Sequence, residues 1–292
     1  MHADHYFCIG QPHVRMGGPC EDYAHSWQEN DFSVVAVSDG CGGAFADTDI
    51  GARIVTHTFM EQARGLDPCV PEAWLNNAFR QKVCEQVVAR AFTPRAEDLY
   101  ATLVGMVATP SVAKVLVMGD GAIAVRHADG RLHLIEAEWT GNAPCYPAYT
   151  AHAARLDAFL ADMPADEKTS AFRLNHTTAR SAGASGQYEV TDEWSEAFPA
   201  ETAVQGTVLS FDPIADGIEG IALLSDGFSR MGGVSEGLFH PLHIAGRFMA
   251  FKNFRGGFVK RRMIAEMQAL ARQGHLPGDD TAIACVWFGN TD

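Results

Sequence analysis

The stretch Ser33-Val-Val-Ala-Val-Ser-Asp39-Gly40-Cys-Gly-Gly43 is the part of the sequence around which the rest is best interpreted. Residues 34–37 form a continuous run of small and β-branched apolar side chains, typical of a strand buried on both faces. The run leads directly into Asp39 and then into glycines. Glycines let the backbone turn sharply and bring its carbonyl groups close to whatever the carboxylate holds. The stretch therefore predicts a buried strand that ends at a functional carboxylate.

The same pattern, an apolar strand with Asp and Gly at one end, occurs three more times. Strands predicted over 115–118 and 220–225 end at Asp120 and Asp226, and Gly278-Asp279-Asp280 precedes a strand over 281–288. If these ends converge, the carboxylates remain ionised near neutral pH only when a cation compensates their repulsion. Oxygen ligands without a His or Cys pattern favour Mg²⁺ or Mn²⁺.

A simple turn is the alternative explanation for each Asp-Gly pair, because Asp-Gly after a strand is a common turn sequence. Turns lie in polar surroundings, whereas Asp39 and Asp226 directly follow strands whose composition predicts deep burial. Four such pairs in one chain favour a shared metal site over four unrelated turns.

Five short motifs follow one another along the chain. They are Glu21-Asp22-Tyr-Ala-His25, Val37-Ser-Asp39-Gly40-Cys-Gly42-Gly43, Gly119-Asp120-Gly121, Leu224-Ser-Asp226-Gly227 and Gly278-Asp279-Asp280-Thr281. Their order and spacing resemble the metal-dependent Ser/Thr protein phosphatases, the type 2C or PPM family. The stretch from His13 to Asp22, a His followed by a Gly-rich gap and Pro-Cys-x-Asp, resembles the bacterial branch of this family. The resemblance implies an α+β fold, a four-layer α-β-β-α sandwich of two antiparallel sheets flanked by helices. It also implies hydrolysis of phosphoserine or phosphothreonine by a metal-activated water, without a covalent intermediate.

The resemblance further implies two Mn²⁺ or Mg²⁺ ions, with a third, weaker ion in some members. Asp39 would bridge the two main ions, Asp226 and Asp279 would complete the first, and Asp120 with Asp226 would hold the third. The full set of implied metal ligands is Glu21, Asp22, Asp39, the Gly40 carbonyl, Asp120, Asp226 and Asp279.

Two positions in this comparison stay open. The last motif is one residue tighter than the usual Asp-Asn-x-Thr, so Asp279 and Asp280 are alternative ligands, of which we favour Asp279. Family members also carry an Arg or His upstream of the Glu-Asp pair, and it holds the substrate phosphate. Arg15, with its planar fork of donors, and His13 are the alternatives here.

The sequence departs from the family pattern at two further positions. Cys41 stands where animal members have a His proposed as general acid, and bacterial members often have Met there. Arg230 stands where some members have another acid, which weakens the case for the third ion.

Composition sets the class of protein. The chain has 292 residues, of which 47% are apolar and 20% charged, as in soluble globular proteins. We expect one domain over 1–292, with an insertion or flap around 139–206. The net charge of −14 disfavours nucleic acid as a partner, and no apolar run is long enough to cross a membrane. Seven scattered cysteines and the absence of a signal-peptide pattern lead us to expect a reduced, cytoplasmic protein.

Hydrophobic periodicity predicts the secondary structure. Inside 139–206 it predicts an irregular loop over 142–149, a short helix over 151–162 and a flexible link over 181–186. Elsewhere it predicts strands over 4–10 and 207–211, helices over 49–65, 71–92, 241–252 and 257–273, and a β-meander over 99–137.

A phosphorylated protein substrate and a cognate Ser/Thr kinase are the partners that the resemblance implies. The alternative function is a catalytically silent module of the same fold that binds a partner, or a switch enzyme acting on one dedicated protein. The silent module would be expected to lack carboxylates, and Asp39, Asp226 and Asp279 are all present. The sequence does not indicate the oligomeric state.

Overall fold

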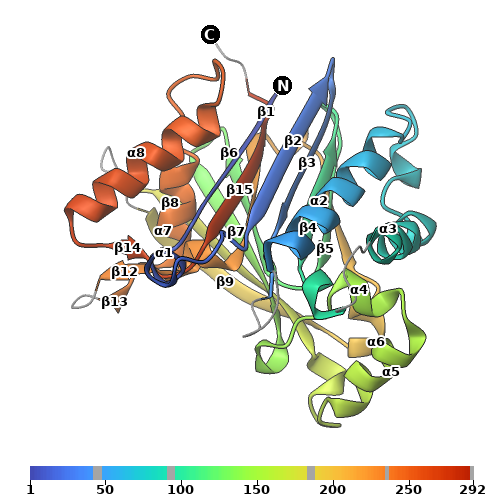
Figure 1. Cartoon of the computed structure of the whole chain (residues 1–292). Helices are drawn as coiled ribbons and strands as arrows, with labels where there is room; N and C mark the ends of the chain where they lie inside the picture. Colours follow the sequence, from blue (N-terminus) through green and yellow to red (C-terminus); the bar gives the residue numbers. More distant parts are fainter. Residues whose placement is uncertain (42–47, 91–95, 183–187, 234–236, 290–292) are drawn as a thin grey trace.

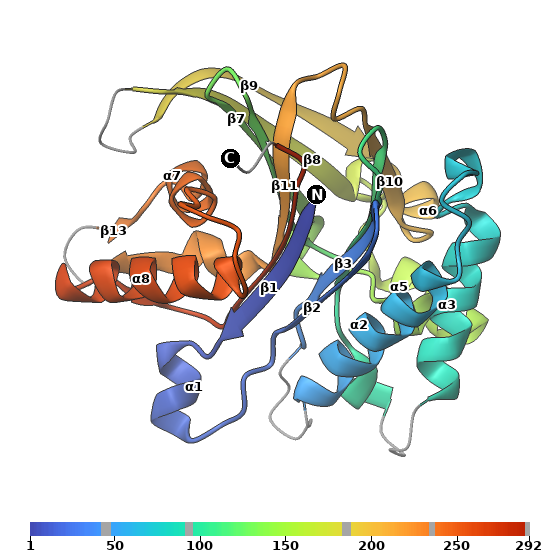
Figure 2. The ribbon, with the colours of Figure 1, turned by 90° about the horizontal axis from the view of Figure 1, so that it is seen from above.

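Two antiparallel sheets lie face to face, and helices cover the outer face of each (Figure 1). The structure is a computed structural model that describes residues 1–41, 48–90, 96–182, 188–233 and 237–289. Seen from above, the layers follow one another as helices, sheet, sheet and helices (Figure 2). The predicted α-β-β-α sandwich is confirmed.

The larger sheet has seven strands in the order β1-β15-β11-β6-β7-β8-β9. Their bounds are β1 (His2–Cys8), β15 (Thr281–Trp287), β11 (Ile218–Leu224), β6 (Gly121–His127), β7 (Arg131–Trp139), β8 (Phe172–Ser181) and β9 (Tyr188–Phe198).

The second sheet has five strands in the order β10-β5-β4-β3-β2, and a small three-stranded sheet has the order β13-β12-β14. The bounds are β10 (Thr207–Phe211), β5 (Ala113–Met118), β4 (Leu103–Ala108), β3 (Phe32–Ser38), β2 (Tyr23–Glu29), β13 (Gly237–Leu238), β12 (Met231–Gly233) and β14 (Leu276–Pro277).

Two pairs of helices form the outer layers. Helices α2 (Thr48–Arg64) and α3 (Asn77–Ala89) pack on the five-stranded sheet, and α7 (Pro241–Phe248) and α8 (Phe258–Arg272) pack on the seven-stranded sheet. Short helices and 3₁₀ turns lie in the connections. They are α1 (Gln11–Met16), α4 (Pro147–Thr150), α5 (Ala153–Asp162), α6 (Ala200–Ala203), and the 3₁₀ turns Pro71–Ala73, Ala96–Leu99, Thr140–Asn142, Lys168–Ser170 and Asp226–Arg230.

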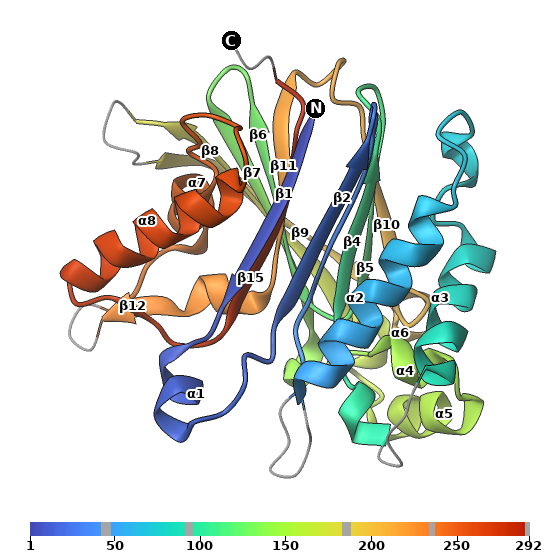
Figure 3. The ribbon, with the colours of Figure 1, turned by 45° about the horizontal axis from the view of Figure 1, so that its top comes forward.

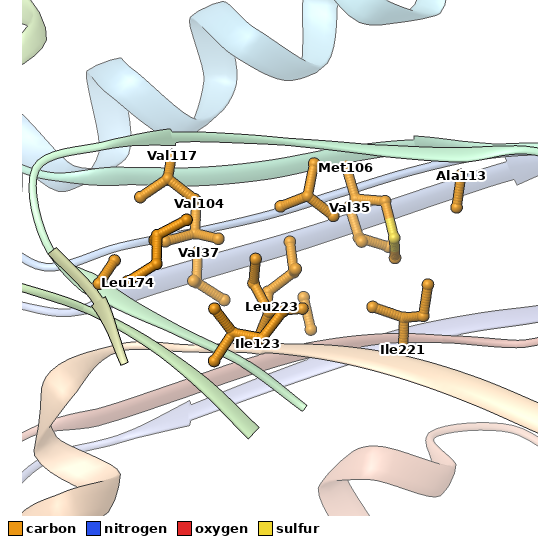
Figure 4. Packing of buried hydrophobic residues seen from close by; sticks show 14 of the residues in the cluster. Val35, Val37, Val104, Met106, Ala113, Val117, Ile123, Leu174, Ile221 and Leu223 are labelled. Carbon is orange, nitrogen blue, oxygen red and sulfur yellow. The ribbon is translucent and has the colours of Figure 1, made fainter. Parts of the chain in front are cut away.

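Both faces of strand β3 are buried, which explains the apolar run over residues 34–37. Val35 and Val37 point into the core between the sheets, where they meet side chains such as Ile123 and Leu223 (Figure 4). Val34 and Ala36 point the other way, into the layer beneath α2 and α3. All seven residues of the strand are buried, so its interpretation as a strand buried on both faces is confirmed.

The predicted meander over 99–137 is wrong in one respect, because its strands belong to two sheets. Strand β5 pairs with β4 in the five-stranded sheet, and β6 pairs with β7 in the seven-stranded sheet. The chain crosses between the sheets at Gly119-Asp120-Gly121. Both glycines have positive φ, 94° and 134°, which side-chain-bearing residues rarely adopt. The crossover places Asp120 where the two sheets meet.

The helix predicted over 71–92 begins later than expected. Leu75 has φ 55°, which interrupts the helix, and α3 starts after Asn76. The Asn76 side chain accepts a hydrogen bond from Phe79 N at 3.0 Å, and this satisfies one of the free amides of the first turn.

Residues 139–206 contain more regular structure than predicted. Strands β8 and β9 form a long antiparallel hairpin that extends the seven-stranded sheet beyond β7. Residues 183–187, which include most of the predicted flexible link, lie outside the part of the chain that the structure describes. Among the described residues, no helix is long and apolar enough to span a membrane.

Candidate active site

Antiparallel pairing brings the Asp-bearing strand ends together. Strand β11 runs antiparallel to both β6 and β15, so the residue after β11 lies beside the residues that precede the other two strands. In the facing sheet, β3 ends at the same edge. Asp39, Asp120, Asp226 and Asp279 consequently line one pocket of about 550 Å³.

The other pocket residues come from helix α1 and from the loops and short turns around these strand ends. Figure 3 shows α1 on one side and α4 and α5 on the other side of this end of the sheets. The complete lining is His13, Met16, Gly18, Glu21, Asp39, Gly40, Cys41, Thr102, Asp120, Asn142, Pro144, Tyr146, Asp226, Arg230 and Asp279. Gly42 and Gly43, the end of the opening motif, lie outside the described residues.

Asp22 lies beneath the pocket and is only 3% exposed. Its Oδ2 accepts a hydrogen bond from Ser225 Oγ at 2.5 Å. Burial raises the pKa of Asp22 well above its usual value, the hydrogen bond from Ser225 opposes this, and Asp280 raises the pKa further. The ionised form of this carboxylate therefore requires positive charge nearby.

The pKa values of Asp39 and Asp120 are raised as well. Burial, followed by the charges of Asp22, Asp226 and Asp120, raises the pKa of Asp39 well above its usual value. Burial and then Asp226 raise the pKa of Asp120 to about 7. These carboxylates repel one another, so a cation that neutralises them would be bound favourably.

Arg230 supplies one positive charge to the cluster. Its Nη2 lies 2.8 Å from Asp226 Oδ2 and its Nη1 lies 2.8 Å from Asp279 Oδ2. Asp226 is the main cause of a raised pKa of Arg230. The guanidinium thus bridges two of the carboxylates that the family resemblance assigns to the first metal ion.

The adjacent residues Asp279 and Asp280 have different surroundings. Asp279 lines the pocket, whereas Asp280 is 2% exposed and does not. The two oxygens of Asp280 accept hydrogen bonds from Gly10 N and Glu21 N, each at 2.5 Å. Asp280 therefore ties the loop after β1 to the start of β15, and Asp279 is the one that faces the pocket.

His13 and Arg15 both lie on α1, but only one of them lines the pocket. His13 lines the pocket, with Nδ1 3.0 Å from Asp280 Oδ2 and Nε2 3.7 Å from Glu21 Oε1. Burial lowers the pKa of His13, but Asp280, Glu21 and Asp279 together outweigh it and raise the pKa. Arg15 is exposed and is not part of the pocket wall.

Close backbone packing explains one of the glycines at these strand ends. A Cβ atom on Gly227 would lie 1.6 Å from the Asp280 carbonyl oxygen. A side chain at this position would push the Asp279-Asp280 segment away, so the Asp-Gly pair after β11 does more than allow a turn.

Sequence reasoning did not find the side chains that hold the aspartates. Thr102 Oγ1 accepts a hydrogen bond from Asp39 N at 3.1 Å, and Ser38 Oγ donates to Thr102 O at 2.5 Å. Ser225 holds Asp22 and also accepts from Ala282 N at 2.8 Å. The repeated tripeptide Ser-Asp-Gly, at 38–40 and 225–227, was the signal that could have found both serines.

The donor set fits a hard divalent cation in its chemistry, because it consists of carboxylate oxygens that repel one another in a half-buried pocket. Across the described ranges, no three His, Cys, Asp or Glu side chains converge in the geometry of a bound metal ion. Two of the carboxylates instead contact Arg230.

Comparison with known proteins decides the family. The profile of the family described as Protein phosphatase 2C matches residues 9–251. The chain belongs to the protein phosphatase 2C family. Of the five motifs, all but Gly278-Asp279-Asp280-Thr281 lie inside the matched range. No curated protein sequence matches this family member significantly.

Several solved structures share this fold at low sequence identity. A bacterial serine phosphatase is 13% identical, with a TM-score of 0.55 over 100% of this chain and 99% of that one. A serine/threonine phosphatase from Staphylococcus aureus is 12% identical, with a TM-score of 0.54 over 99% and 96%. A C. elegans sex determining protein is 16% identical, with a TM-score of 0.52 over 99% of this chain and 65% of that one.

Proposed function

We propose that this protein is a metal-dependent phosphatase that removes phosphate from phosphoserine or phosphothreonine in proteins. The observation that carries the proposal is the convergence of four strand-end carboxylates on one pocket in a chain of the protein phosphatase 2C family. Phosphoprotein substrates follow from membership of a protein phosphatase family.

The residues of the pocket would have different roles in metal binding, according to their positions. Asp39, Asp226 and Asp279 would hold divalent ions, with Asp22, Glu21 and the Gly40 carbonyl on the second side. Asp120, together with Asp226, would hold a third, weaker ion. When bound, Mn²⁺ or Mg²⁺ supplies a water of lowered pKa and positive charge for the phosphoryl oxygens.

The position and the charge of His13 support a role for this residue at the substrate phosphate. It lies in the pocket wall, and its contacts with Asp280 and Glu21 favour the protonated, positively charged ring. A charged ring at this place can neutralise a phosphoryl oxygen or donate a proton to the leaving oxygen. We therefore favour His13 over Arg15 as the phosphate contact.

A catalytically silent binding module is the second candidate, and Arg230 favours it. Its single positive charge lies between Asp226 and Asp279, so the negative charge of the metal-free site is partly compensated without any ion. A chain that no longer binds metal could retain its fold by this contact.

Hydrolysis assays with a matched pair of variants test the proposal. Asp39 and Asp31 stand at opposite ends of β3, roughly 25 Å apart for a strand of this length. With p-nitrophenyl phosphate and a phosphothreonine peptide in Mn²⁺, we expect Asp39→Asn to lower kcat/KM by about 100-fold or more. Asp31→Asn, at an exposed turn, should hydrolyse both substrates like the wild type. A folded wild type that hydrolyses neither substrate at any Mn²⁺ concentration would favour the silent module.

A further inference from the structure

A second hollow of about 650 Å³ lies beside the candidate active site. It lies between the turn at residues 140–143, helix α5 and the segment after α5. Tyr149, Phe159, Met163 and Pro164 form much of its wall, which also contains the charged residues Arg155, Asp162 and Glu167. We call it the flanking pocket.

The flanking pocket and the active-site pocket share one thin partition. Along residues 141–149, Asn142, Pro144 and Tyr146 line the active-site pocket, whereas Gly141, Ala143 and Tyr149 line the flanking pocket.

Aromatic rings form the inner part of this partition. The ring of Tyr100 stacks on that of Tyr146, with centroids 5.4 Å apart and planes inclined by 12°, and lies edge-on to Tyr149 at 4.9 Å. The Tyr100 carbonyl accepts a hydrogen bond from Cys41 N at 2.8 Å, which joins this layer to the loop after Asp39. About one layer of rings therefore separates the two hollows.

We propose that the flanking pocket binds a large apolar side chain of the phosphoprotein substrate, a few residues from the phosphorylated one. The inference rests on the proposed function, because it requires the phosphorylated residue to occupy the active-site pocket. An extended peptide advances about 3.3–3.6 Å per residue, so a neighbouring residue can cross a partition one ring thick.

The chemistry of the walls selects this occupant. Burying a Phe or Leu side chain against the apolar part of the wall is favourable. An acidic side chain would lose its hydration there and would face two like charges, Asp162 and Glu167, against the single positive charge of Arg155. A substrate with Phe, Leu or Met at the right distance should therefore be preferred over one with Gly or Asp.

Filling the pocket tests the inference without touching the catalytic machinery. Ala158 lies on α5, is exposed and lines the flanking pocket, so Ala158→Trp would occupy it from the solvent side. Ala154 is also exposed on α5, about one turn earlier, and does not line the pocket. Ala154→Trp is the matched control.

The substrates are phosphothreonine peptides of alanine and glycine that carry a single Phe two, three or four residues to either side of the phosphothreonine. For wild type and Ala154→Trp, we expect kcat/KM to rise about ten-fold or more when Phe stands at one of these positions. In Ala158→Trp this preference should disappear through a higher KM. Hydrolysis of p-nitrophenyl phosphate should be equal in all three proteins.

Two results overturn the inference while leaving the proposed function intact. One is p-nitrophenyl phosphate hydrolysis by the wild type with no Phe position preferred. The other is a Phe preference that persists in Ala158→Trp, which would place the apolar contact elsewhere. Failure of the wild type to hydrolyse p-nitrophenyl phosphate at all would contradict the proposed function itself, and the inference would fall with it.

Discussion

Asp279 and Asp280 are neighbours in the chain, but the structure assigns them different tasks. Asp280 is buried, and two backbone N–H groups and the His13 ring contact its oxygens. Asp279 faces the pocket and contacts Arg230. One is therefore expected to matter for stability, and the other for binding and catalysis.

Alanine at each position separates these tasks. Asp280→Ala leaves Gly10 N and Glu21 N without partners, so we expect the free energy of unfolding to fall by about 3 kcal/mol in urea titrations. Asp279→Ala should change it by less than about 1 kcal/mol but abolish hydrolysis of p-nitrophenyl phosphate. The reverse pattern would make Asp280 the ligand.

We expect Arg230 to compete with a metal ion for two carboxylates. Replacing it by Met removes a positive charge that lies 2.8 Å from both Asp226 and Asp279. We expect Arg230→Met to bind Mn²⁺ about ten-fold more tightly than wild type in calorimetric titrations, because an ion no longer displaces the guanidinium.

The control for this prediction is Arg126→Met. Arg126 lies on β6, and this substitution removes its partly exposed ion pair with Glu219, in which Nε and Oε2 are 3.3 Å apart. Its Mn²⁺ affinity should equal that of the wild type. Unchanged or weaker binding by Arg230→Met would show that the guanidinium supports the metal site.

At the level of single residues, the convergence of the carboxylates was predictable from the sequence, whereas most of the contacts that support them were not. Asp39, Asp120 and Asp226 were visible because each stands beside glycine at the end of an apolar run. The structure brings all three into one pocket. The repeated Ser-Asp-Gly tripeptide marks Ser225, but its partner Asp22 and the contact of Arg230 with Asp279 could not be predicted, because they join segments far apart in the chain.

Elements with a strong apolar pattern were predictable, and those that depend on pairing were not. Strands β3 and β11 are buried on both faces and can be recognised in the sequence by their continuous apolar runs. Strand β9 pairs only with β8, at the edge of the sheet, and is exposed along nearly its whole length, so charged residues interrupt the apolar alternation in its sequence. The meander failed for a similar reason, since local patterns do not say to which sheet a strand belongs.

The outer strands of the large sheet carry a histidine pair that makes stability depend on pH. His133 of β7 and His176 of β8 are hydrogen-bonded ring to ring at 3.0 Å, and Trp194 of β9 stacks on both. Burial, followed by His176 and other cationic neighbours, lowers the pKa of His133 from 6.5 to about 4. The folded protein therefore resists protonation here.

The lowered pKa of His133 sets the direction in which stability changes with pH. The unfolded chain takes up this proton near pH 6.5 but the folded chain only near pH 4, so acidification favours unfolding across that window. The contribution reaches about 3 kcal/mol at most. In urea titrations at pH 7 and pH 4.5, His133→Gln should lose less stability on acidification than the wild type. His152→Gln, exposed before α5, is the control and should behave like the wild type. Equal losses in all three proteins would contradict the prediction.

On the scale of the whole molecule, the antiparallel topology builds the pocket. Two sheets contribute strand ends to one edge, and the crossover at Gly119-Asp120-Gly121 joins them there. The apolar core between the sheets holds these ends at a fixed separation (Figure 4). We propose that residues 1–292 act as one catalytic domain, in which the segment 139–206 provides the wall of Asn142, Pro144 and Tyr146 toward the substrate.

We propose that this edge of the sandwich is a site for divalent cations. The most direct measurement is a calorimetric titration of the metal-free protein with Mn²⁺, comparing wild type with Asp39→Asn and Asp31→Asn. We predict about two equivalents bound by wild type and Asp31→Asn, and the loss of at least one equivalent in Asp39→Asn. Absence of Mn²⁺ binding by the folded wild type, or equal binding by Asp39→Asn, would contradict the claim.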